Sequence, residues 1–111
     1  MRGLPARFGW RSLWAGATLG AALCAPLAAQ PADDPLVVAK GRQLYTSFCA
    51  RCHGVNMVTT GVAFDLRNFP SDQPERFERS VNQGVRAMPA WGAILKPADV
   101  QALWHFVTVG R

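Results

Sequence analysis

The segment CARCH at residues 49–53 constrains this chain more than any other feature of its sequence. Two cysteines stand three positions apart, and a histidine follows the second one directly. Four kinds of site use such a cysteine pair: a structural zinc site, a redox dithiol, a disulfide, and covalent attachment of a haem. The spacing suits the last of these, because two cysteines one helical turn apart each reach one vinyl group of a porphyrin. The histidine then lies under the iron.

The other three kinds of site fit the sequence less well. A structural zinc site needs four ligands, whereas the chain beyond residue 29 has only Cys49, Cys52, His53 and His105. His105 has no second histidine near it in the sequence. A thioredoxin-like dithiol follows a strand in a βαβ unit, and no such pattern is present. A plain disulfide between the two cysteines stays open as an alternative.

The N-terminal segment has the three parts of a secretory signal. Three arginines and no acidic residue stand in the first 11 positions, an uncharged run of mostly apolar residues follows over 12–29, and small residues close it. We expect cleavage after Ala29, so that residues 1–29 are removed together with Cys24. The alternative is a retained membrane anchor, for which the run is near the minimum length. Residues 30–35 are expected to be a short mobile lead-in.

The expected mature chain is one small domain, with residues 36–111 as its folded part. It keeps nine basic and seven acidic residues, a net charge of +2, and contains no cluster of Lys or Arg. Nucleic acid is therefore not expected as a partner. A polypeptide core of this size is marginal by itself, and a large apolar cofactor would supply the missing buried surface. Export also favours haem, since bacterial c-type maturation takes place outside the cytoplasmic membrane.

Helical patterns account for most of the domain. Apolar residues recur at helical spacing over residues 34–48, 73–84 and 96–111, and each stretch has a proline in its first turn. The sequence therefore predicts an all-α fold with three main helices. Between the first two lies a long loop, residues 55–72, which needs something to wrap around.

The second axial ligand of a haem iron would come from across the ring. Met57 lies only four residues after His53 and is expected to stay on the histidine side as core, and His105 is expected to be structural. Met88 stands 35 residues after His53 in the segment AMPAWG, where Pro89 stiffens the loop. We expect Met88 to ligate the iron, and Trp91 to close over the edge of the haem.

The segments GRQLYTSFCARCHG, AMPAWG and LKPADVQALWHFV together resemble the small bacterial class I cytochromes c. This resemblance implies three main helices and long loops wrapped around one covalently bound haem c, with Cys49 and Cys52 as thioether ligands. It also implies a crossing of the first and last helices, where Gly41 and Tyr45 meet Leu103 and Phe106. The family usually has a Pro-x-Leu after the haem motif, whose proline carbonyl holds the histidine. Here Asp65 precedes Leu66, so the partner of His53 is open.

The resemblance implies a periplasmic one-electron carrier rather than an enzyme, with His53 and Met88 filling both axial positions of the iron. The segment GVNMVTTGVAFDLRNFP also resembles small cytochromes associated with quinoprotein alcohol dehydrogenases. The implied partners are a periplasmic dehydrogenase as donor, and a terminal oxidase or second cytochrome as acceptor. Arg51 and Arg86 are candidates to steer an acidic partner. Two alternatives remain: a haem sensor of small ligands, and a cytochrome subunit that works only inside a dehydrogenase complex. The second would have an exposed apolar patch, for which Trp91, Ile94 and Leu95 are the candidates.

Overall fold

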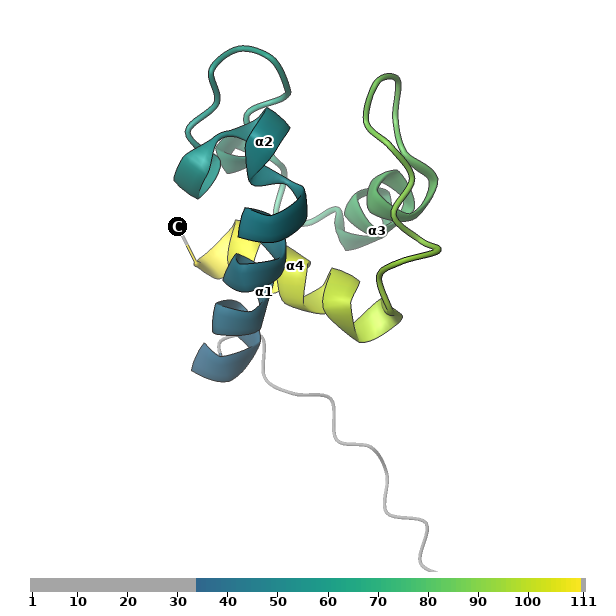
Figure 1. The fold of residues 1–111 in the computed structure, drawn as a ribbon. Coiled ribbons are helices and arrows are strands. Elements are labelled where there is room, and N and C mark those ends of the chain that lie inside the picture. The colour runs from purple at the N-terminus through teal and green to yellow at the C-terminus, as the bar shows by residue number, and fades with distance from the viewer. Residues whose placement is uncertain (1–33, 111) are drawn as a thin grey trace, which may run out of the picture.

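The computed structural model describes residues 34–110 of the chain. The expected signal segment and residues 30–33 of the expected lead-in therefore lie outside the described residues, whereas Asp34 and Pro35 belong to the start of the first helix. Within them the regular elements are helical: α1 (Pro35–Phe48), α2 (Ala50–His53), η1 (Val55–Met57), η2 (Leu66–Asn68), α3 (Pro74–Gln83) and α4 (Pro97–Val109). The all-α prediction is confirmed, and the three main helices begin and end within two residues of the predicted ranges (Figure 1).

The three long helices begin where the sequence signals predicted. Each has its proline in the first turn, where a missing backbone N–H removes no helical hydrogen bond. At the start of α1, the Asp34 side chain accepts a hydrogen bond from the Leu36 N–H at 2.9 Å and so caps the helix. At the start of α4, the Asp99 side chain accepts from the Lys96 N–H at 2.9 Å.

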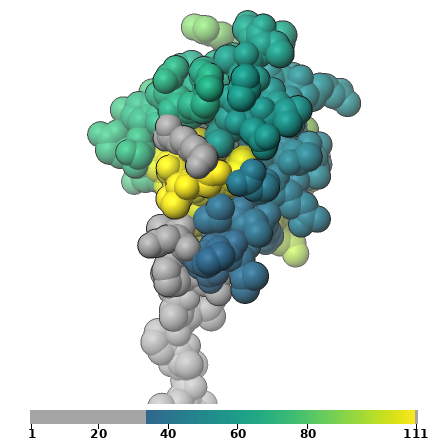
Figure 2. Space-filling model, turned by 90° about the vertical axis from the view of Figure 1, so that its left-hand side faces the viewer, coloured from purple at the N-terminus to yellow at the C-terminus, as the bar shows by residue number. Residues whose placement is uncertain are grey.

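Helices α1 and α4 cross in close contact, as the resemblance implied (Figure 1). Gly41 lies at the crossing, where a Cβ would come within 2.8 Å of the Phe106 Cβ and closer still to the Ala102 carbonyl. The rings of Tyr45 and Phe106 meet at a centroid distance of 5.3 Å. The glycine is needed because only a residue without a side chain permits this approach. Figure 2 shows the end of α4, in yellow, lying next to α1, in blue.

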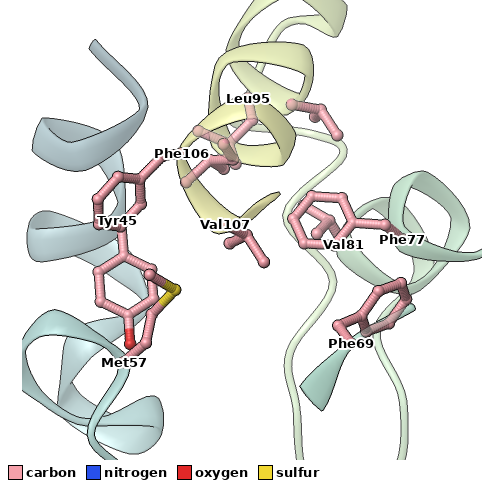
Figure 3. Packing of buried hydrophobic residues seen from close by; sticks show 10 residues of the cluster. Tyr45, Met57, Phe69, Phe77, Val81, Leu95, Phe106 and Val107 are labelled. Atoms are coloured by element: carbon pink, nitrogen blue, oxygen red, sulfur yellow. The ribbon is translucent and has the colours of Figure 1, made fainter. Parts of the chain in front are cut away.

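The buried core joins these helices to the segments that follow them. Its most deeply buried side chains are Tyr45, Met57, Leu103, Phe106 and Val107. In Figure 3, Tyr45 and Met57 lie to one side of Val107, and Phe69, Phe77 and Val81 lie to the other. Over residues 34–110, no helix is long and apolar enough to cross a membrane.

Candidate cofactor site

A cavity of about 310 Å³ lies between Tyr45 on one side and Phe69, Phe77 and Val81 on the other. This volume lies at the lower end of the range of about 300–1,000 Å³ that is typical of cofactor and ligand sites. Apolar side chains from η2, α3, α4 and the loops around them form most of its wall. The lining residues are Tyr45, Cys49, His53, Phe64, Leu66, Phe69, Arg76, Phe77, Ser80, Val81, Val85, Arg86, Met88, Leu103 and Val107.

The CARCH segment forms a single turn of helix at one wall of this cavity. Cys49 ends α1 and begins α2, and the N–H groups of Cys52 and His53 both donate to its carbonyl, at 3.1 and 2.9 Å. Cys49 and His53 line the cavity, whereas Cys52 is exposed and is not part of the lining. The helical turn therefore brings two of the three predicted residues to one wall, with the second thiol at the solvent side.

A backbone carbonyl fixes the orientation of the His53 imidazole. Its Nδ1 lies 2.9 Å from the carbonyl oxygen of Phe64, which is only an acceptor, so Nδ1 carries the proton and donates. In the neutral imidazole with this tautomer, the other ring nitrogen, Nε2, has the free lone pair. This is the form of histidine that binds metals, and an acceptor on the far nitrogen strengthens it as a ligand. The partner that the sequence left open is thus Phe64.

The environment of Cys49 does not suit a redox dithiol. Burial, and to a smaller degree the charge of Cys52, raises the pKa of the Cys49 thiol to about 11. Dithiol oxidoreductases depend on a cysteine whose pKa is lowered, because the thiolate is the nucleophile. The site does not suit zinc either: among the described residues, no three His, Cys, Asp or Glu side chains are grouped so that they would hold a metal ion.

Met88 reaches the cavity from the loop between α3 and α4. A tight turn holds it there, in which Met88 N–H donates to the Val85 carbonyl and Val85 N–H donates to the Met88 carbonyl, at 2.9 and 3.2 Å. Arg86, at the tip of the turn, has a φ of 53°. At the base of the loop, Gly84 has a φ of 75°, and a Cβ there would lie within 3.0 Å of the Pro89 and Ala90 backbone. The loop is therefore held to one conformation near the cavity.

The remaining candidates take other positions. Trp91 does not line the cavity; its ring packs against Phe48 at a centroid distance of 5.3 Å. Its contact with a cofactor stays a prediction. Met57 is buried in the core, 1% exposed, and His105 lies on α4 outside the cavity wall. The sequence predicted an exposed apolar patch of Trp91, Ile94 and Leu95. This prediction is wrong for Leu95, which is buried, and of the three residues Ile94 is the one that is largely exposed.

Sequence reasoning missed several functional features of this region. Phe64 was not singled out, although its carbonyl orients His53 and its ring lines the cavity. Arg76 was not singled out either, although it and Arg86 are the two arginines of the lining. The exposed apolar side chains also gather elsewhere than expected, in the loop after α2. They are Val55, Val58, Val62 and Phe64.

The residues of the cavity fit a haem. The wall is mostly apolar, and His53 and Met88 reach it from two different segments of the chain. Cys49 also lines the cavity, and Cys52 follows one helical turn later. Imidazole and thioether are the axial ligands that cytochromes of the c type give to haem iron. Two thiols one turn apart suit the two vinyl groups of the porphyrin.

The chain is similar to several known proteins. The family described as cytochrome c oxidase, cbb3-type, subunit III matches residues 37–107. Cytochrome c6 of Microcystis aeruginosa is 32% identical over 72 residues, 60% of this chain and 89% of that protein.

The quinohemoprotein alcohol dehydrogenase ADH IIB of Pseudomonas putida is 36% identical over 76 residues, 66% of this chain. The quinohemoprotein alcohol dehydrogenase ADH-IIG of the same organism is 26% identical over 77 residues, 68% of this chain. The chain spans only 11% of the length of each dehydrogenase. The chain belongs to the cytochrome c family, and within it to the group described as cytochrome c oxidase, cbb3-type, subunit III.

Proposed function

We propose that this chain is a periplasmic one-electron carrier that holds one covalently bound haem c. Membership of the cytochrome c family supports a haem-based electron carrier. The single observation that carries the proposal furthest is the His53–Phe64 hydrogen bond at the wall of an apolar cavity. This bond orients the imidazole so that its other nitrogen can bind a metal. Among the described residues, no group of three or more His, Cys, Asp or Glu side chains could hold a metal ion without a cofactor.

Each residue of the site has a role in this proposal. Cys49 and Cys52 would form the thioether bonds to the haem, and His53 and Met88 would ligate its iron. When bound, the haem supplies the Fe(II)/Fe(III) couple, and thioether ligation favours Fe(II). The chain contributes an apolar wall that excludes water and a loop held in place by the Val85–Met88 turn. With His53 and Met88 as its ligands, the iron would have no open position for a substrate.

Arg76 and Arg86, the two arginines of the cavity lining, would form ion pairs with the carboxylates of the haem. A haem carries two propionate groups, and a carboxylate next to an apolar wall needs a positive partner. Arg76 lies over the Phe69 ring at 5.3 Å, and its Nη1 donates to the Gln73 side chain at 3.0 Å. Arg86 is held at the tip of the Met88 turn. These two side chains are the ones in the lining that carry a full positive charge at neutral pH.

Spectra of the purified protein in both oxidation states test the electron-carrier proposal. Reduction by dithionite and reoxidation by ferricyanide should interconvert two low-spin spectra through a one-electron transition. The reduced protein should not bind CO, because Met88 occupies the sixth position. CO binding to the wild-type protein at neutral pH would favour the sensor alternative and would contradict a closed electron carrier.

A dehydrogenase is the donor that the similarities favour. The sequence resembles part of two quinohemoprotein alcohol dehydrogenases, so a quinoprotein acting on alcohols is the proposed class of donor. A terminal oxidase or a second cytochrome is the proposed acceptor. Stopped-flow reduction by a quinoprotein dehydrogenase and by an unrelated donor tests the first of these, and equal rates would remove the specific partner.

A second candidate is a cytochrome subunit fixed within a dehydrogenase complex. Exposed valines in the loop after α2 favour it, because Val55, Val58 and Val62 are 73%, 56% and 75% exposed. Such side chains suit a stable interface better than a brief encounter. Gel filtration distinguishes the two candidates: a free carrier elutes as a monomer and stays separate from the dehydrogenase, and a subunit elutes with it.

A further inference from the structure

The Phe64 carbonyl that orients His53 belongs to the peptide group that joins Phe64 to the backbone nitrogen of Asp65. The orientation of that carbonyl depends on the backbone angles of both residues. Asp65 has a φ of −72° and a ψ of 103° and is the N-cap of η2. Whatever holds Asp65 in this conformation therefore also holds the acceptor of the His53 Nδ1–H.

The Asp65 carboxylate makes a set of local bonds that fix this conformation. Its Oδ1 accepts from the Arg67 backbone N–H at 3.0 Å and from Arg67 Nε at 2.9 Å, and its Oδ2 accepts from Arg67 Nη2 at 2.6 Å. The first bond closes the turn that aspartate and asparagine side chains form with their own backbone. The other two are a paired carboxylate–guanidinium contact, which is directional as well as strong. The Asp65 side chain is only 20% exposed.

The loop that leads into Phe64 is also held from its other end. Thr59 Oγ1 donates to the Ala63 carbonyl at 2.9 Å, and the Gly61 N–H donates to the same Thr59 oxygen at 3.1 Å. The Phe64 side chain itself is 56% exposed and packs edge-on against the Phe69 ring at a centroid distance of 6.4 Å. The hydrogen bonds on its two sides, together with this ring contact, hold the backbone whose carbonyl accepts from His53.

We propose that Asp65 is a positioning residue for the His53 ligand, acting through the Phe64 carbonyl. The inference rests on the proposed haem ligation by His53. An acceptor held firmly on Nδ1–H makes the imidazole a stronger donor to the iron and favours Fe(III). Loss of the Asp65 turn frees the carbonyl, weakens the Nδ1–H bond, and raises the reduction potential.

Three variants of the haem-loaded protein separate this role from a charge effect and from a general loss of stability. Asp65→Asn removes the charge and keeps an oxygen for the Arg67 N–H, whereas Asp65→Ala removes both. Because both variants are neutral at residue 65, a difference between them comes from the turn. Asp34→Ala is the matched control, since Asp34 makes the same type of side-chain bond, to Leu36 N–H, at the start of α1.

Two measurements report on the hydrogen bond itself. In the reduced, diamagnetic protein, hydrogen exchange of the His53 Nδ1–H should be about tenfold faster in Asp65→Ala than in Asp65→Asn, as expected for loss of one hydrogen bond. The reduction potential of Asp65→Ala should also lie above that of Asp65→Asn, and Asp34→Ala should match the wild type in both readouts. Equal exchange rates and equal potentials in the two Asp65 variants would overturn the inference. A protein that takes up haem with other axial ligands would instead overturn the proposed ligation.

Discussion

Gly41 of α1 packs directly against the backbone of Ala102 in α4, with no space between the two helices for a side chain at residue 41. The contact places Tyr45, one turn further along α1, against the Phe106 ring at 5.3 Å. The same helix ends at Phe48 and leads through Cys49 directly into the CARCH turn. The helix crossing and the cofactor site are thus parts of one arrangement.

Substitution of Gly41 by alanine is predicted to destabilise the protein. In an exposed helix the change would stabilise by about 1 kcal/mol, because glycine is a poor helix former. At this crossing the new Cβ meets backbone, which is unable to move aside cheaply, and we expect a net loss of about 1–3 kcal/mol in the free energy of unfolding. Urea unfolding of the haem-loaded protein measures it. The control is Gln43→Ala on the exposed side of α1, expected to stay within about 0.5 kcal/mol of the wild type.

Tyr45 is the only tyrosine of the chain, so its ionisation is directly visible in the ultraviolet. Burial, with a smaller contribution from Cys49, raises the pKa of Tyr45 to about 12 from an ordinary value of 10.0. The hydroxyl donates to the Gly54 carbonyl at 2.7 Å. The absorbance of the phenolate should therefore appear near pH 12 in the native protein and near pH 10 in the denatured protein.

The same shift predicts a loss of stability in alkali. Between pH 10 and 12 the unfolded chain releases the Tyr45 proton and the folded chain keeps it, so the unfolded state gains stability as the pH rises. The contribution of Tyr45 is complete below pH 10 and is lost through pH 12. Tyr45→Phe should flatten this part of the stability profile. A native titration midpoint near pH 10 would show that the hydroxyl is not buried as described.

Much of the fold was predictable because its signals are local. A proline begins each of α1, α3 and α4, and the crossing of α1 and α4 at Gly41 was implied by the resemblance of the sequence to class I cytochromes c. The histidine partner was not predictable. Phe64 acts through its carbonyl, which every residue type has, so no letter of the sequence marks it. The burial of Leu95 was missed because residues 91–95 form a turn rather than a periodic element.

Met88 is predicted to be the second axial ligand of the iron. The oxidised wild-type protein should show the weak near-infrared band of Fe(III)–sulfur ligation, and Met88→Ala should lose this band and let the reduced iron bind CO. Met57→Ala is the matched control, because Met57 is buried but does not line the cavity. It should lower the free energy of unfolding by about 2–5 kcal/mol and keep the band. The reverse pattern would assign the ligand to Met57.

Arg51 is predicted to speed the encounter with an acidic redox partner. It lies between the two cysteines on α2 and is exposed, so its charge is next to the haem edge expected there. Arg51→Gln should slow reduction by the partner at low salt, and the difference should shrink as salt screens the charges. The control, Arg79→Gln, removes the same charge from an exposed position on α3. Equal slowing by both variants would indicate a net-charge effect without a specific docking site.

Covalent attachment of haem is the claim on which the rest depends, and the mass of the denatured protein tests it most directly. The chain should be produced in a bacterium with c-type maturation, extracted with acid acetone, and weighed intact. We predict that one haem stays on each chain, that the haem-bearing peptide contains Cys49 and Cys52, and that Cys49→Ala or Cys52→Ala sharply lowers the yield of haem-loaded protein. A chain that gives up its haem to acid acetone would contradict thioether attachment, and with it the central claim.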